Sequence, residues 1–68
     1  MNIFEAVTIA VREDKCITTS ESIETVKIKP TNDKGNCIVM GADGSHPSKY
    51  GWQPTADDLM REDWVIKE

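Results

Sequence analysis

Residues 50–65, YGWQPTADDLMREDWV, hold both tryptophans and the only tyrosine of the chain. This stretch predicts a short helix with a defined first turn. Pro54 has a fixed φ and no backbone N–H, and both properties suit the beginning of a helix. Thr55 is followed three residues later by Asp58, which is the spacing of a capping box, and the helix dipole favours an acid at that position. We therefore expect the rest of the chain to be organised around a capped helix with aromatic residues on both sides.

The residues after this cap predict the buried side of the short helix and the last strand. Leu59 and Met60 are its large apolar residues, and we expect them to face the core. Residues 64–66, Trp-Val-Ile, are typical of a strand because aromatic and β-branched side chains favour extended backbone. The tail thus predicts a helix that is followed closely by a terminal strand.

The N-terminal residues predict a second, longer helix. Asn2 and Glu5 have the spacing of a cap. Residues 3–13 carry apolar side chains at helical spacing, with polar side chains between them, and this pattern is typical of an amphipathic helix. We expect its apolar stripe to face the core; the stripe consists of Ile3, Phe4, Val7, Ala10 and Val11.

The middle of the chain predicts strands and turns, and with them the fold class. Pro30 ends one strand because proline cannot donate to a β-ladder, and residues 32–35, Asn-Asp-Lys-Gly, are typical of a hairpin turn. We predict an α+β fold in which a small antiparallel β-sheet carries an N-terminal helix and a short C-terminal helix packed on it. We expect one domain over residues 1–68, with its first strands at residues 15–19, 23–29 and 36–40.

Composition excludes several functional classes. The 68 residues carry a net charge of −4, which argues against binding of a nucleic-acid polymer through its phosphates. No apolar run approaches the ~20 residues of a membrane span, and no signal peptide is visible. We therefore expect no membrane partner and a cytoplasmic protein. A chain this short is near the lower size limit for a stable core, so association into a homo-oligomer is expected to bury more surface.

Residues suited to catalysis or metal binding are scarce. His46 is the only histidine, and its position between a serine and a proline is typical of a surface loop. Cys16 and Cys37 form no C-x-x-C pair, and we interpret them as reduced, small hydrophobic residues. The acidic residues of the tail fit capping and solubility better than acid–base catalysis. We predict no catalytic residue, no metal site and no cofactor.

Aromatic residues near the tail predict a binding site instead. An aromatic face stacks on a nucleobase for about 1–3 kcal/mol, and Tyr50, Trp52 and Trp64 supply such faces. Trp52 lies between a glycine and a polar residue and is the stronger candidate, whereas Trp64 fits a core residue equally well. The glycine-rich loop at residues 41–49 is interpreted as a connector, with one wall of a pocket as the alternative.

Polar residues close to these rings could hold the rest of a nucleotide. Acceptors that could read the edges of a base or ribose are Gln53, Asp58 and Asp63. Phosphates would require exposed backbone N–H groups or a cation, and the candidate cations are Lys49, Arg61 and Arg12.

The tail also resembles a known family. Residues 51–68, GWQPTADDLMREDWVIKE, resemble the C-terminal signature of the second type of Thoeris anti-defence proteins, which are small phage proteins. The signature runs Trp, a polar residue, Pro, Ser or Thr, two variable positions, Asp-Leu-Leu or similar, an acid, Asp-Trp and a hydrophobic residue. Residues 2–6 resemble the opening of the same family.

The resemblance implies a function without catalysis. Members of the family bind cyclic nucleotide-derived immune signals, notably glyco-cyclic ADP-ribose from bacterial TIR-domain proteins, and some hold the cyclic oligonucleotides of CBASS. They sequester the signal without cleaving it, and they assemble into dimers and tetramers with pockets between subunits. By resemblance, this chain is expected to be such a sponge and to act in the cytoplasm of the host cell.

The candidate ligand contacts combine these two lines of reasoning. The resemblance implies that Phe4 turns partly toward the ligand, and the complete candidate set is Phe4, Tyr50, Trp52, Gln53, Thr55, Asp58, Arg61, Asp63 and Trp64. Many members of the family have a stretch similar to Arg-x-Gly-Trp after the first helix, whereas residues 18–22 here read Thr-Thr-Ser-Glu-Ser.

Two other functional classes stay open at this point. The first is a small acidic phage protein that inhibits a host protein by direct binding, which would require an exposed apolar patch. The second is a small hydrolase that acts on the same nucleotides through Asp58 or Asp63.

Overall fold

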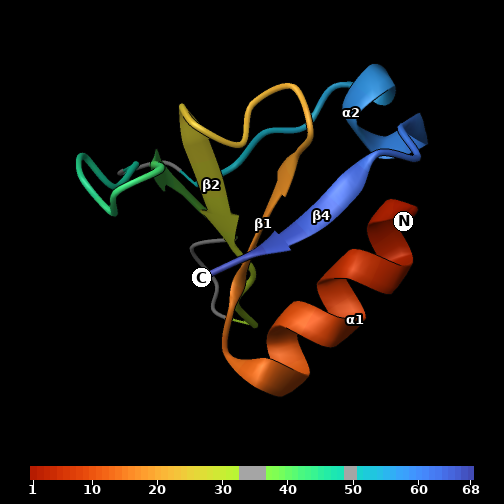
Figure 1. Cartoon of the computed structure of the whole chain (residues 1–68), viewed down its shortest axis with the longest axis horizontal. Coiled ribbons are helices and arrows are strands. Elements are labelled where there is room, and N and C mark those ends of the chain that lie inside the picture. Colours follow the sequence, from red (N-terminus) through yellow and green to blue (C-terminus); the bar gives the residue numbers. More distant parts are fainter. Residues whose placement is uncertain (33–36, 49–50) are drawn as a thin grey trace.

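The chain forms one helix-covered antiparallel sheet (Figure 1). The computed structural model describes residues 1–32, 37–48 and 51–68. Within these ranges the sheet has four strands in the order β3-β2-β1-β4, and all neighbouring strands are antiparallel. The predicted α+β class is confirmed. The elements in chain order are α1 (Ile3–Glu13), β1 (Cys16–Thr19), β2 (Val26–Lys29), β3 (Ile38–Gly41), α2 (Ala56–Met60) and β4 (Trp64–Lys67).

Helix α1 begins at the predicted cap. The Asn2 side chain accepts a hydrogen bond from the Glu5 N–H at 2.9 Å, and the Glu5 carboxylate accepts one from the Asn2 N–H at 3.1 Å. This reciprocal pair satisfies N–H groups that have no partner inside the helix. The helix ends at Asp14, whose φ of 57° is left-handed.

The buried side of α1 differs from the predicted stripe. Ala6 and Ala10 face the sheet and are fully buried, whereas Phe4 is 78% exposed and Val11 is 47% exposed. The prediction that Phe4 and Val11 belong to the core was therefore wrong. Small side chains allow the helix backbone to approach the sheet closely, and at about 100° per residue Phe4 then projects from the opposite side.

One face of the sheet forms the apolar core. Ile17 of β1 lies opposite Ile28 of β2 and Ile66 of β4, and cross-strand partners project from the same face. Trp64 lies two residues before Ile66 on β4 and therefore shares this face. Helix α1 covers the β1 and β4 half of this face (Figure 1). The segment that leads into α2 packs against the β2 and β3 half through Trp52.

The connection between β1 and β2 is longer than predicted. Residues 23–25 were expected to belong to the second strand, but they lie in a turn. The Ser22 carbonyl accepts hydrogen bonds from the N–H groups of Thr25 and Val26 at 2.9 and 3.1 Å. These bonds coil the backbone until β2 begins at Val26. The hairpin between β2 and β3 is present, and positions 33–35 of its predicted turn lie outside the described residues.

Helix α2 has the predicted cap but not the predicted buried side. The Thr55 hydroxyl accepts a hydrogen bond from the Asp58 N–H at 3.2 Å, and the Asp58 carboxylate accepts one from the Thr55 N–H at 2.9 Å. However, Leu59 is 51% exposed and Met60 is 70% exposed, so the prediction that they face the core was wrong. A backbone carbonyl connects the helix to the core instead: the Trp64 indole N–H donates to the Asp58 carbonyl at 3.0 Å.

The beginning of the chain lies beside β4. The Trp64 N–H donates to the Met1 carbonyl at 3.0 Å, and the Met1 nitrogen donates to the Trp64 carbonyl at 3.2 Å. Figure 1 shows this proximity at the end of β4 nearest α2. No helix in the described part of the chain is both long enough and apolar enough to span a membrane.

Candidate ligand-binding pocket

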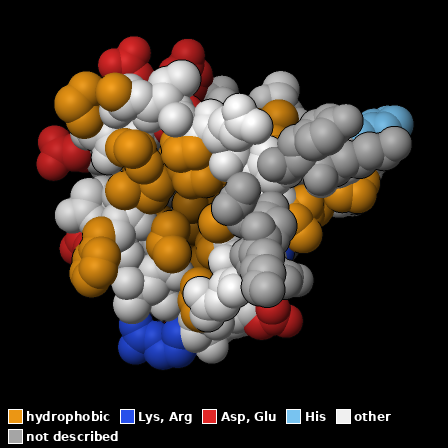
Figure 2. All heavy atoms as spheres, turned by 180° about the vertical axis from the view of Figure 1, so that it is seen from behind, with side chains coloured by type: hydrophobic (Ala, Val, Ile, Leu, Met, Phe, Trp, Pro, Cys, Tyr) orange, Lys and Arg blue, Asp and Glu red, His pale blue; other side chains and the backbone are white. Residues whose placement is uncertain are grey.

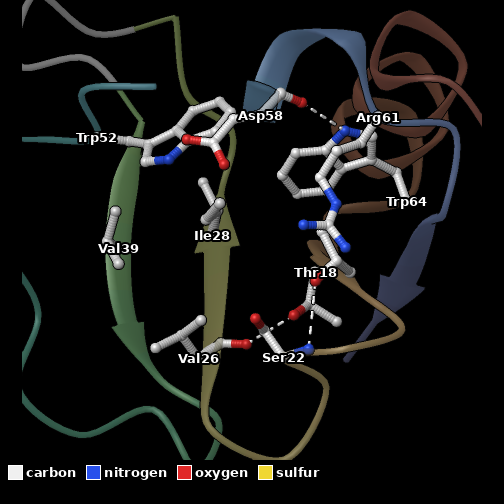
Figure 3. Close-up of a pocket in the computed structure, with 10 residues that line it drawn as sticks. Thr18, Ser22, Val26, Ile28, Val39, Trp52, Asp58, Arg61 and Trp64 are labelled. Carbon is white, nitrogen blue, oxygen red and sulfur yellow. Dashed lines mark hydrogen bonds between the residues drawn. The ribbon is translucent and has the colours of Figure 1, made fainter. Parts of the chain in front are cut away.

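A pocket of about 140 Å³ opens between the two tryptophans and the β2 and β3 half of the sheet (Figure 3). Its aromatic wall comes from Trp52 and Trp64. The apolar floor and the polar rim are formed by Val26, Ile28, Val39, Thr18, Thr19, Ser22, Asp58 and Arg61.

The two indoles have different roles in the wall. Trp64 is 2% exposed, and its indole N–H is bound to α2, so its ring is fixed in the core. Trp52 is half-buried and meets Trp64 edge to face, with ring centroids 5.7 Å apart and an interplanar angle of 81°. Gly51 has a φ of 79°, a left-handed conformation that suits glycine, and the Trp52 N–H then donates to the Cys37 carbonyl at 2.7 Å. Trp52 therefore lines the pocket from a backbone that is anchored beside β3.

Arg61 reaches the rim of the pocket within an ion-pair network. Its Nε and Nη2 atoms donate to the two carboxylate oxygens of Asp63 at 2.8 and 2.7 Å, and Nη2 also donates to Glu21 at 2.9 Å. Ser20 Oγ donates to the same Asp63 carboxylate at 2.9 Å. The bonds from Arg61 hold the pKa of Asp63 well below its ordinary range, and the Asp63 and Glu21 carboxylates raise the pKa of Arg61. The guanidinium is thus held rigidly, and its charge is already balanced by two carboxylates.

Asp58 joins the pocket to the helix cap. One of its carboxylate oxygens, Oδ2, accepts the capping bond from Thr55, and its carbonyl holds the Trp64 ring. The side chain also lines the pocket, between the positions of Trp52 and Trp64 in Figure 3. A carboxylate accepts several hydrogen bonds, so Asp58 retains capacity for a donor from a ligand.

The structure brings together only part of the predicted set. Trp52, Asp58, Arg61 and Trp64 line the pocket, and Asp63 supports Arg61 from behind. The other members lie elsewhere. Gln53 and Thr55 are exposed and do not line this pocket. Phe4 and the alternative phosphate contact Arg12 border a separate groove on α1. Tyr50 and Lys49 are outside the described residues.

Sequence reasoning missed the sheet residues that form the rest of the pocket. Val26 and Ile28 alternate along β2, and Val39 is the cross-strand partner of Ile28, so all three project into one floor. The alternation was visible in the sequence, but the pairing of the strands was not. Thr18 and Thr19 are buried and belong to the stretch that replaces the arginine and tryptophan of the resembled pattern. Their hydroxyl groups give this rim a neutral polar character.

The match to a family sequence model covers nearly the whole chain. The model describes the Thoeris anti-defense 2-like domain and matches residues 1–67. The chain belongs to this family. No curated protein and no solved structure gives a significant match. Membership in this family supports a phage anti-defence role for the chain. It also agrees with the resemblance inferred from residues 51–68.

Proposed function

We propose that this domain binds a cyclic nucleotide immune signal in the pocket beside Trp52 and sequesters it uncleaved in the cytoplasm of the host cell. The two candidate signals are glyco-cyclic ADP-ribose from Thoeris TIR proteins and the cyclic oligonucleotides of CBASS. The observation that carries the proposal is the half-buried indole of Trp52 on a pocket whose rim holds the Asp58 carboxylate.

The chemistry of the pocket suits a nucleobase or nucleoside. Stacking of a base on the Trp52 ring contributes about 1–3 kcal/mol, and the apolar floor of Val26, Ile28 and Val39 excludes water from the other side. The Asp58 carboxylate accepts from an exocyclic amine or a ribose hydroxyl. Because Arg61 is already paired with two carboxylates, it attracts a phosphate only weakly, so we place the phosphates of the ligand at the edge of the pocket.

The size of the pocket supports binding by an assembly. A volume of about 140 Å³ is well below the roughly 300 Å³ at which pockets for drug-sized ligands begin. One chain therefore encloses one base or sugar of a cyclic nucleotide, and a second copy is needed to cover the remainder. Effective sequestration requires a dissociation constant near the nanomolar range, about −12 kcal/mol. We infer a homo-oligomer, either a dimer or a tetramer, as the binding form.

The positions of the possible proton carriers support release of an unchanged ligand. His46 lies in an exposed loop and does not line the pocket. Asp58 is engaged in the cap of α2, and Asp63 has a lowered pKa because of its bonds to Arg61, which makes it a weak base. A general acid that works near neutral pH needs a raised pKa, and the pKa of Asp63 is shifted in the opposite direction.

Recovery of the bound ligand tests this proposal. The protein is incubated with glyco-cyclic ADP-ribose, separated from free ligand, denatured, and the released molecule is analysed by mass spectrometry. We expect intact ligand from the wild type and from Q53A, whose side chain is outside the pocket, and little or none from W52A. Recovery of an altered molecule would instead indicate a hydrolase, and equal recovery from W52A would place the ligand elsewhere.

Direct inhibition of a host protein is the second candidate function. It is favoured by the exposed side chains of Leu59 and Met60, which leave apolar surface on α2 beside acidic residues. Figure 2 shows hydrophobic side chains across the face seen from behind, with acidic side chains near its upper left edge. Absence of nucleotide binding, together with a defined complex that L59D disrupts, would favour this alternative.

A further inference from the structure

The outer face of α1 carries an unusual combination of side chains. Phe4 is 78% exposed, and together with Glu5, Thr8, Ile9 and Arg12 it borders an open groove along the helix. These residues lie on the side opposite the buried Ala6 and Ala10. A large exposed aromatic ring on a surface helix is a typical component of an interface.

We propose that the outer face of α1 binds the same face of a second copy of this chain, with the two helices antiparallel across a two-fold axis near Thr8. This inference rests on the proposed homo-oligomer and identifies one of its contact surfaces. It does not depend on which nucleotide the Trp52 pocket binds.

The charges on this face are self-complementary. Glu5 lies in the first turn of α1 and Arg12 in the last turn, with Thr8 between them. In an antiparallel pair, Glu5 of each copy therefore faces Arg12 of the other copy, and the two helix dipoles also oppose each other favourably. Each chain contributes one negative and one positive charge here, although the whole chain has a net charge of −4. A second copy can thus approach this face without the repulsion that the rest of the surface would impose.

The packing at the centre also suits a close approach of two helices. Thr8 is small, and its hydroxyl donates to the Phe4 carbonyl at 2.7 Å within its own helix. Its hydrogen-bonding group is therefore satisfied, and burial at the crossing point leaves no donor without a partner. Phe4 of one copy then lies near the Arg12 stem of the other copy, where an arginine stacks favourably on an aromatic ring.

The pairing leaves the nucleotide pocket accessible. The groove on α1 and the Trp52 pocket share no lining residue. A second contact at the pocket is therefore compatible with pairing through α1. Two different two-fold surfaces on one chain build a tetramer from dimers when their axes meet at right angles.

Charge exchange between copies tests this surface. The variants R12E and E5R are each measured by sedimentation equilibrium without ligand, and far-UV circular dichroism checks their folding. Two-fold symmetry repeats the Glu5–Arg12 pair, so each reversal replaces two attractive pairs with two repulsive ones, and we expect the dissociation constant of this contact to rise at least about tenfold. An equimolar mixture of the two folded variants restores both attractive pairs, so we expect the assembly to return in the mixture.

Two further variants separate this surface from folding and from the ligand. F4A removes a ring that is largely exposed, so it should weaken assembly while the circular dichroism spectrum stays unchanged. E24R reverses an exposed charge in the turn between β1 and β2, and should assemble like the wild type. Three results would overturn the proposal. The first is a wild type that is monomeric, the second is an R12E or F4A variant that assembles like the wild type, and the third is a mixture of R12E and E5R that gains no mass. If the variants and their mixture assemble as expected but the wild type binds no nucleotide, only the proposed function is refuted.

Discussion

Trp64→Phe tests whether α2 depends on the indole that connects it to the core. The change removes the hydrogen bond from the indole N–H to the Asp58 carbonyl, at a cost of about 1 kcal/mol. The smaller ring also leaves unfilled space at a position that is 2% exposed, which adds about 1–2 kcal/mol. The sum is about 2–3 kcal/mol, and at roughly 0.05–0.15 kcal/mol per residue this is a large share of the stability of a small domain.

The matched control is Trp52→Phe. Trp52 is half-buried, and no hydrogen bond joins its indole N–H to another residue in the described ranges. We expect this variant to lose less than about 1 kcal/mol because less buried surface is removed. Both variants are compared by thermal and urea unfolding, followed by far-UV circular dichroism. A difference of about 2 kcal/mol corresponds to about 8–16 °C in Tm for a domain of this size. Equal destabilisation of the two variants would refute the role assigned to Trp64.

Three further predictions concern the ion pairs and caps around the pocket. D63N should remove part of the acid sensitivity of unfolding. Arg61 lowers the pKa of Asp63 in the folded state, so the ionised carboxylate stabilises the fold at pH values above its unfolded pKa of about 3.9. This stabilisation is lost as the pH falls through the lower folded pKa. Urea unfolding of wild type and D63N from neutral to strongly acidic pH measures this, and parallel curves would contradict it. T55A should cost about 1 kcal/mol through loss of the α2 cap, with faster amide exchange at Asp58 as the local readout and unchanged exchange as the opposing result. R61K should keep the positive charge but lose the bidentate contact to Asp63. Because salt screens this ion pair, the loss of folding stability should be smaller at high salt than at low salt. A loss that does not depend on salt would show that packing dominates.

The sequence predicted those parts of the fold that depend on neighbouring residues. Both capping boxes, at Asn2 and Thr55, formed as expected because each uses groups only three residues apart. The α+β class also followed from local periodicity. In the candidate pocket, Trp52, Asp58 and Arg61 were already in the predicted set, since they belong to one short stretch of the tail.

The errors and omissions involve contacts between distant parts of the chain. Phe4 was placed in the core because helical spacing alone does not show that two alanines set the packing distance. Leu59 and Met60 were expected to be buried, but α2 is attached through a backbone carbonyl rather than through an apolar side. The pocket floor on β2 and β3 was missed because it depends on strand register, which pairs residues far apart in sequence.

Titration calorimetry with glyco-cyclic ADP-ribose tests the central claim most directly. We predict a dissociation constant near the nanomolar range for the wild type and for Q53A. For W52A we predict binding that is weaker by about 10- to 100-fold, in line with the loss of one stacked base. Binding that is micromolar or weaker in the wild type, or affinity that is unchanged in W52A, would contradict a nucleotide trap built on the Trp52 pocket.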